Sequence, residues 1–191
     1  DLEKENFTDN GSVNVEGARI KCWKHGGHGT QTFLQVVENS CNPGFVELGQ
    51  RIGKETLFEY IKNFGFGSKT GVDLNGEGSG ILFNLDKVGP VELATTAFGQ
   101  GVSVTPIQQI TAVSAAINGG TLYQPYIVKS LNEPETNTII KETTPTVKRK
   151  VISEETSEKV RMALESVVSN GTGRSAFIEG YRVGGKTGTA Q

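Results

Sequence analysis

The chain has 191 residues, enough for one domain with a hydrophobic core or for one domain with a small second lobe. Hydrophobic residues make up 35% of the sequence and charged residues 21%, as in soluble globular proteins. The formal net charge of −2 provides no electrostatic footprint for nucleic acid. No apolar run approaches the roughly 18 residues that a membrane span needs.

The first 21 residues are polar and rich in turns, with a short hairpin expected around Val13–Val15 and Ala18–Ile20. After this segment, apolar residues recur at helical spacing, and capping residues, Pro and Gly mark where helices begin and end. These signals predict helices over residues 30–40, 43–52, 57–64, 91–98, 106–117 and 154–170.

Strands are expected in the second half of the chain. Residues 121–131 alternate in polarity and are predicted to pair with residues 138–142. Residues 181–191 form an extended strand in this interpretation, whereas residues 65–90 and 132–150 look like loops. The predicted fold class is therefore α+β and mainly helical, with one partial domain over residues 1–191.

The closing stretch GYRVGGKTGTAQ fits two motifs. Gly180, Gly185, Lys186 and Thr187 match the phosphate-binding pattern G-x-x-x-x-G-K-[ST], which would indicate a nucleotide-binding protein. A phosphate-binding loop needs a helix that starts at its Lys and Thr. Here Gly188 follows at once and the β-branched residues favour a strand, so the nucleotide-binding interpretation is disfavoured.

The same letters contain the triad Lys-Thr-Gly of penicillin-recognising enzymes, at residues 186–188, although a second copy occurs at residues 69–71. The partner triad Ser-x-Asn begins at Ser12, Ser40 and Ser130. Only the copy at Ser40 lies at a turn between two amphipathic helices, where a hydroxyl and an amide can project into a cleft. Placement thus favours residues 40–42 together with residues 186–188.

Longer phrases resemble the transpeptidase domain of class B penicillin-binding proteins. They are VVENSCNPGF, NFGFGSKTGVDLNGEGSG, TTAFGQGVSVTPIQQITAVSAAINGGTLYQPYIV and NGTGRSAFIEGYRVGGKTGTAQ, which cover most of residues 29–131 and 170–191. The phrase IKCWKHGGHGTQTFLQVVENSCNPGF further resembles the sporulation-specific branch of that family.

The resemblance implies a serine acyl transferase that cross-links peptidoglycan stem peptides and is acylated by β-lactams. It implies catalytic roles for Ser40, Asn42, Lys186 and Thr187, and substrate-binding roles for Gly188 and Thr189. In that scheme Ser40 relays a proton to the leaving amine, and Lys186 attracts the substrate carboxylate and tunes Ser40.

The family places its nucleophile in an S-x-x-K motif that precedes Ser-x-Asn. No serine of this sequence has a lysine three residues later. We therefore expect the nucleophile in a segment N-terminal to Asp1, and we expect this fragment alone to be inactive. The resemblance also implies an extracytoplasmic location, an anchor outside this chain and a possible membrane glycosyltransferase partner.

All cysteines and histidines of the chain lie within 20 residues, at Cys22, His25, His28 and Cys41. Two thiolates and two imidazoles would complete a tetrahedral zinc site, and the glycines of HGGHG allow the backbone to wrap a metal. The sequence thus predicts a structural zinc site over residues 22–41, in which an upstream carboxylate could replace one histidine.

Two alternatives to zinc remain open at this stage. A Cys22–Cys41 disulfide is compatible with an extracytoplasmic location, and a free buried thiol with surface histidines is the simplest interpretation. The cluster also leaves a second functional hypothesis, a non-catalytic module with zinc-stabilised loops that binds a peptide or a partner protein.

Overall fold

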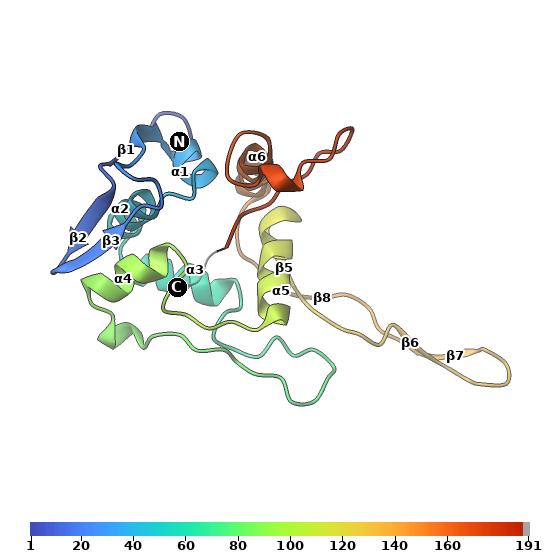
Figure 1. Ribbon diagram of the computed structural model, residues 1–191. Helices are drawn as coiled ribbons and strands as arrows, with labels where there is room; N and C mark the ends of the chain where they lie inside the picture. Colours follow the sequence, from blue (N-terminus) through green and yellow to red (C-terminus); the bar gives the residue numbers. More distant parts are fainter. Residues whose placement is uncertain (189–191) are drawn as a thin grey trace. The chain divides into compact units, whose positions relative to one another are not determined.

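The computed structural model describes residues 1–188 and divides the chain into two compact units. Unit 1 comprises Asp1–Phe58, Phe83–Val102 and the residues from Glu158 onward, and unit 2 comprises Glu59–Leu82 and Ser103–Ser157. The helices are α1 (Phe33–Glu38), α2 (Asn42–Ile52), α3 (Lys54–Asn63), α4 (Pro90–Ala97), α5 (Pro106–Ile117) and α6 (Glu154–Ser169), with 3₁₀ turns η1 (Leu85–Lys87) and η2 (Arg174–Ala176) (Figure 1). The α+β class expected from the sequence is confirmed.

The strands form four separate antiparallel pairs within the described residues. In unit 1, β1 (Asn6–Asp9) pairs with β4 (Gly29–Thr32), and β2 (Ser12–Val15) pairs with β3 (Ala18–Lys21). In unit 2, β5 (Thr121–Gln124) pairs with β8 (Thr146–Lys150), and β6 (Ser130–Asn132) pairs with β7 (Ile139–Glu142). The predicted β2–β3 hairpin is therefore confirmed.

Two strand predictions need correction. The stretch 121–131 is interrupted: its end pairs with residues 139–142 as predicted, but its first part pairs with β8, which lies in a segment that we expected to be a loop. Residues 181–188 are not a strand in this structure and have no strand partner among the described residues. A strand is stabilised only by pairing with a neighbour, so β-favouring residues alone do not make one.

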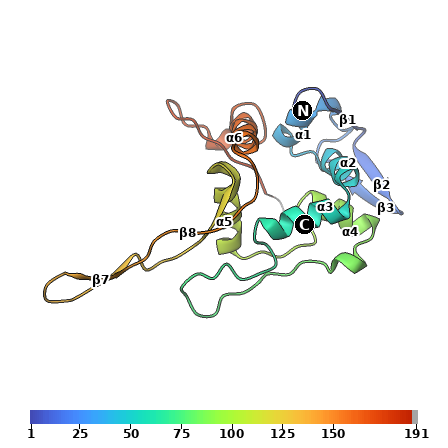
Figure 2. The same ribbon diagram turned by 180° about the vertical axis from the view of Figure 1, so that it is seen from behind.

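The core of unit 1 packs around α2, which contacts α4, β1 and β3 (Figures 1 and 2). One buried cluster contains Phe7, Val36 and Cys41, and a second contains Val15, Val46 and Ala94. Cys41 is fully buried, so one of the predicted metal ligands is also a core residue. The first cluster thus places the turn between α1 and α2 directly on the core.

In unit 2, α5 packs on β5, and the β6–β7 hairpin extends away from the helix (Figures 1 and 2). Thr105 caps α5, as its sequence predicts, and Gln108 completes the capping box. The side-chain amide of Gln108 also donates to the carbonyl oxygens of Ser68 and Ser79, each at 2.8 Å. This buried side chain therefore holds the glycine-rich loop 65–82 on α5. No helix of the described residues is both long and apolar enough to span a bilayer.

We predict that Gln108→Ala lowers the free energy of unfolding by about 2 kcal/mol, because two loop carbonyls lose their buried donor. Urea denaturation followed by circular dichroism measures this. The neighbouring Gln109→Ala is the control, because Gln109 is exposed, and it should change the free energy of unfolding by no more than about 0.5 kcal/mol. Equal effects of the two substitutions would show that Gln108 does not hold the loop.

Candidate active site and metal-ligand cluster

Ser40 lies in a tight turn between α1 and α2, in the left-handed backbone region with φ of +50°. The backbone N–H of Ser40 donates to Val37 O at 3.2 Å, and that of Cys41 donates to Val36 O at 3.1 Å. Helix α2 begins directly afterwards, with Pro43 in its first turn. Few residues other than glycine adopt this conformation without support, so neighbouring contacts must hold Ser40 in it.

Lys186 reaches the Ser40 side chain although 146 residues separate the two in sequence. Its ammonium Nζ donates to Ser40 Oγ at 2.7 Å and to the carbonyl and hydroxyl oxygens of Thr187 at 3.0 and 3.3 Å. Much of the Lys186 side chain remains accessible, but the packing around its ammonium lowers its pKa from the usual lysine value. The pair can therefore pass a proton between an amine and a hydroxyl.

A second set of contacts ties α1 to the end of α6 and the segment after it. The carbonyl of Glu38 accepts hydrogen bonds from Thr172 N at 2.9 Å and Thr172 Oγ1 at 3.1 Å. The carboxylate of Glu38 accepts from Ser166 Oγ. Thr172 Oγ1 also lies 3.1 Å from Thr187 Oγ1, so the end of α1 and the K-T-G segment share one anchor. A Cβ at Gly171 would lie 2.4 Å from the Glu38 carbonyl oxygen, which explains the glycine there.

The structure brings together three of the four residues to which the sequence assigned catalysis: Ser40, Lys186 and Thr187. The fourth, Asn42, lies one residue after Cys41, and its side-chain amide donates to Lys21 O at 3.2 Å. Gly188 has open space where a Cβ would be, and Thr189 lies outside the described residues. The roles assigned to these residues remain predictions.

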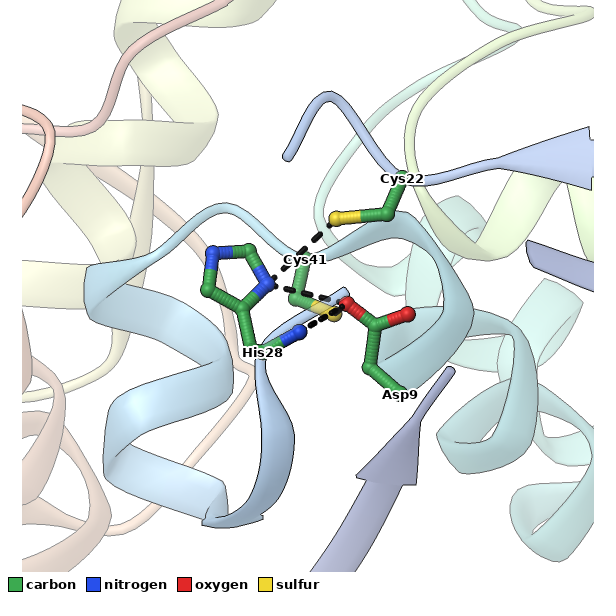
Figure 3. A group of neighbouring side chains, drawn as sticks. All are labelled: Asp9, Cys22, His28 and Cys41. Carbon is green, nitrogen blue, oxygen red and sulfur yellow. Dashed lines mark hydrogen bonds and ion pairs between the residues drawn. The ribbon is translucent and has the colours of Figure 1, made fainter. Parts of the chain in front are cut away.

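Four side chains of unit 1 converge on one point: Asp9, Cys22, His28 and Cys41 (Figure 3). Their ligand atoms all lie within 4.8 Å of one another. His28 Nδ1 is 2.9 Å from Asp9 Oδ2 and 3.3 Å from Cys22 Sγ, and Cys41 Sγ is 3.3 Å from Asp9 Oδ2. A tetrahedral zinc with bonds of about 2.0–2.3 Å separates its ligand atoms by about 3.3–3.8 Å. The two sulfur distances of 3.3 Å lie at the edge of this range and the 2.9 Å between His28 and Asp9 is shorter, so these groups could hold such an ion after small side-chain shifts.

Burial and hydrogen bonding set the charges of this group. Burial raises the pKa of Asp9, but hydrogen bonds from Cys22, the Gly11 N–H and His28 outweigh it and hold that pKa at about 2. Burial, with a contribution from the Asp9 carboxylate, raises the pKa of the Cys41 thiol to about 12. The pKa of Cys22 is raised for the same reasons. Two thiols beside a carboxylate stay protonated unless a cation replaces their protons.

His25 is not part of this group, and Asp9 takes the fourth place. An upstream carboxylate was anticipated from the sequence, but no pattern identified which one. Asp9 is brought in by the pairing of β1 with β4, which sets Asp9 opposite Gly29, next to His28. Gly27 allows this approach, because a Cβ there would lie 2.3 Å from Asp9 O and from Gly11 N. The HGGHG glycines are the only local signal of such close packing.

Comparison with known proteins identifies the family. The family model described as "Penicillin binding protein transpeptidase domain" matches residues 2–191. Stage V sporulation protein D of Bacillus subtilis strain 168 is 69% identical over 190 residues, all of this chain and 29% of that protein. Penicillin-binding protein PbpB of Mycolicibacterium smegmatis is 36% identical over 95% of this chain and 29% of its own length. The chain thus spans less than a third of either relative.

Solved structures agree with the family model. Penicillin binding protein 3 of Mycobacterium tuberculosis, complexed with ampicillin, superimposes with a TM-score of 0.89 at 33% identity, covering 100% of this chain and 43% of that one. The D,D-transpeptidase domain of a peptidoglycan glycosyltransferase from Eggerthella lenta gives a TM-score of 0.89 at 28% identity, over 99% of this chain and 49% of that one. The chain therefore belongs to the penicillin-binding protein transpeptidase domain family, and Ser40 and Lys186 are in contact within it.

Proposed function

We propose that this chain is part of a serine D,D-transpeptidase that cross-links peptidoglycan stem peptides and is acylated by β-lactams. The hydrogen bond from Lys186 Nζ to Ser40 Oγ carries the proposal, because it joins two triads that are remote in sequence. Membership in the family and the ampicillin complex of a similar protein support it. The 69% identity to a protein named for sporulation supports synthesis of the spore cortex as the process.

The geometry suggests how these residues divide the work. The lowered pKa of the Lys186 ammonium makes it a better proton donor to Ser40 Oγ than an exposed lysine, and Ser40 can pass the proton to the leaving amine. Before this transfer, the charged Lys186 ammonium attracts the terminal carboxylate of a stem peptide, with Thr187 as a hydrogen-bond donor. Asn42, Gly188 and Thr189 would bind the substrate backbone, as the family resemblance implies.

The attacking serine is not among these 191 residues in our proposal, because none of their serines is followed by lysine at the third position. These residues then supply the proton relay and the carboxylate site, and another segment supplies the nucleophile. An extracytoplasmic location, a membrane anchor outside this chain and a membrane glycosyltransferase as partner complete the proposal. The small net charge of −2 agrees with a partner other than nucleic acid.

We predict that Lys186→Met in the intact protein slows acylation by a fluorescent penicillin by about 100-fold, because the developing charge loses its nearest cation. Gel fluorescence over time measures the rate. Lys87→Met, at an exposed position of η1, is the matched control and should label like the wild type. Residues 1–191 expressed alone should take up no label. Stoichiometric labelling of them would place the nucleophile within this chain.

We further propose that Asp9, Cys22, His28 and Cys41 bind a structural zinc ion. The supporting observation is the donor set itself: two thiols, an imidazole and a carboxylate, with Asp9 and Cys41 buried and Cys22 and His28 partly buried. Both cysteines are free thiols in the structure and are therefore available as ligands. Four protein ligands would fill the tetrahedron, so the ion would order loops rather than bind substrate. If the protein is not a transpeptidase, the same site would suit a zinc-stabilised module that binds peptides.

We predict that His28→Ala abolishes zinc binding, whereas His25→Ala keeps about one zinc per chain, because only His28 lies in the cluster. Elemental analysis of intact protein purified in reductant without added zinc measures the metal content. Retention of zinc by His28→Ala would refute this ligand set. A wild-type protein without metal, lighter by two hydrogens, would instead establish the Cys22–Cys41 disulfide.

A further inference from the structure

Three consecutive residues, Lys21, Cys22 and Trp23, lie against the turn that carries Ser40. The Lys21 carbonyl accepts from the side-chain amide of Asn42, and Cys22 shares the ligand cluster with Cys41. Trp23 makes the third contact, in which its indole Nε1–H donates to the carbonyl oxygen of Asn39 at 2.7 Å. The segment Lys21–Trp23 is therefore hydrogen-bonded to the Ser-x-Asn turn on both sides of Ser40, at Asn39 and at Asn42.

The position of Trp23 is unusual for a tryptophan. Its side chain is 63% exposed, yet its only polar hydrogen is used on a backbone carbonyl. Its ring system makes a T-shaped contact with the His28 ring, with centroids 5.3 Å apart and planes at 67°. Trp23 thus contacts a member of the ligand cluster on one side and the active-site turn on the other.

The hydrogen bond from Trp23 to Asn39 O supports the φ torsion angle of Ser40. Asn39 C=O and Ser40 N–H belong to one planar peptide group. The N–H end of this group donates to Val37 O at 3.2 Å, and the C=O end accepts from Trp23 at 2.7 Å. Fixing both ends fixes the plane from which the φ of Ser40 is measured. The left-handed φ of +50°, which presents Ser40 Oγ to Lys186, is thereby supported from outside the helices.

We propose that Trp23 is a positioning residue that transmits the order of the Asp9–Cys22–His28–Cys41 cluster to the Ser40–Lys186 pair. This inference rests on the proposed function and on the proposed zinc site. When His28 and Cys22 are held by an ion, the ring of Trp23 is held between His28 and Asn39 O. When the cluster is empty, His28 is held only by its contacts with Asp9 and Cys22, and the backbone of Cys22 only by the Gly11 carbonyl, so the external support of the peptide plane before Ser40 is weaker.

The first test is Trp23→Phe in the intact protein. This substitution keeps an aromatic ring beside His28 but removes the N–H donor, so the zinc content should stay at the wild-type value. The rate constant for acylation by a fluorescent penicillin should fall by about tenfold, with little change in the preceding non-covalent affinity, because Ser40 is misplaced and the carboxylate site is not. Tyr181→Phe, at another exposed aromatic side chain of unit 1, is the control and should acylate like the wild type.

The second test separates transmission from simple packing. Zinc is removed by a chelator in the presence of reductant, and acylation is measured for wild type and Trp23→Phe. If Trp23 transmits the effect of the cluster, chelation slows acylation of the wild type more strongly than acylation of the variant. The rate reductions caused by chelation and by the substitution then do not multiply. Unchanged acylation of the variant, or effects that multiply fully, would overturn the proposal.

A third measurement needs no catalytic activity and is made on the wild-type protein. The indole N–H of Trp23, assigned by its loss in Trp23→Phe or by selective labelling, should exchange slowly with solvent in the zinc-loaded wild type despite the exposed ring. Its exchange should accelerate on chelation. Fast exchange in the loaded protein would show that the bond to Asn39 does not exist. A wild type that is not acylated at all, with a protected indole, would instead contradict the proposed function and leave the structural link intact.

Discussion

The backbone conformation of Ser40 is the constraint on which the rest of the candidate site depends. Its φ of +50° places a non-glycine residue in the left-handed region, and such residues cost free energy unless their surroundings hold them. Support comes from three directions within unit 1: the Trp23 indole on Asn39 O, the Thr172 contacts with Glu38 O, and the Lys186 ammonium on Ser40 Oγ. Helix α1 has only six residues and could not impose this geometry by itself, since short helices are marginal without tertiary contacts.

The buried carboxylate of Asp9 orders the loop between β1 and β4, which contacts the Ser40 turn. The Asp9 side chain is inaccessible to solvent, and an isolated carboxylate in such a place would be very costly. Its oxygens accept hydrogen bonds from Gly11 N at 2.7 Å and from His28 N at 2.9 Å, and His28 Nδ1 and the Cys41 thiol lie beside them. The same carboxylate therefore closes the loop between β1 and β4 and would provide an oxygen ligand to the proposed ion. If the proposed ion binds, a substitution at Asp9 would affect both the order of this loop and the affinity for the metal.

Local sequence patterns were sufficient to predict much of this structure. They did not predict the contacts between residues that are remote in sequence. Apolar spacing and capping residues located the helices, because these signals act within a few turns of chain. The crowding of Cys22, His28 and Cys41 in sequence pointed to one cluster, whereas Asp9 depends on the register of β1 against β4, which no short pattern encodes. The pairing of β5 with β8 was missed for the same reason. The contact between Lys186 and Ser40 was expected only through family resemblance, because 146 residues separate them.

The placement of the cluster explains what a metal would add to this family's fold. The first 32 residues form strands of only four residues each, and short, isolated strand pairs bury little apolar surface. Zinc ligands drawn from β1, from the loop after β3 and from the turn before α2 would join all three by bonds stronger than that packing. The free energy of metal binding would then appear as stability of the loop that contacts Asn39 and Asn42. Since four protein ligands would leave no open coordination position, any influence of the proposed ion on catalysis would have to pass through protein contacts. Trp23 provides the most direct of them, because its hydrogen bond ends on the peptide group of Ser40 itself.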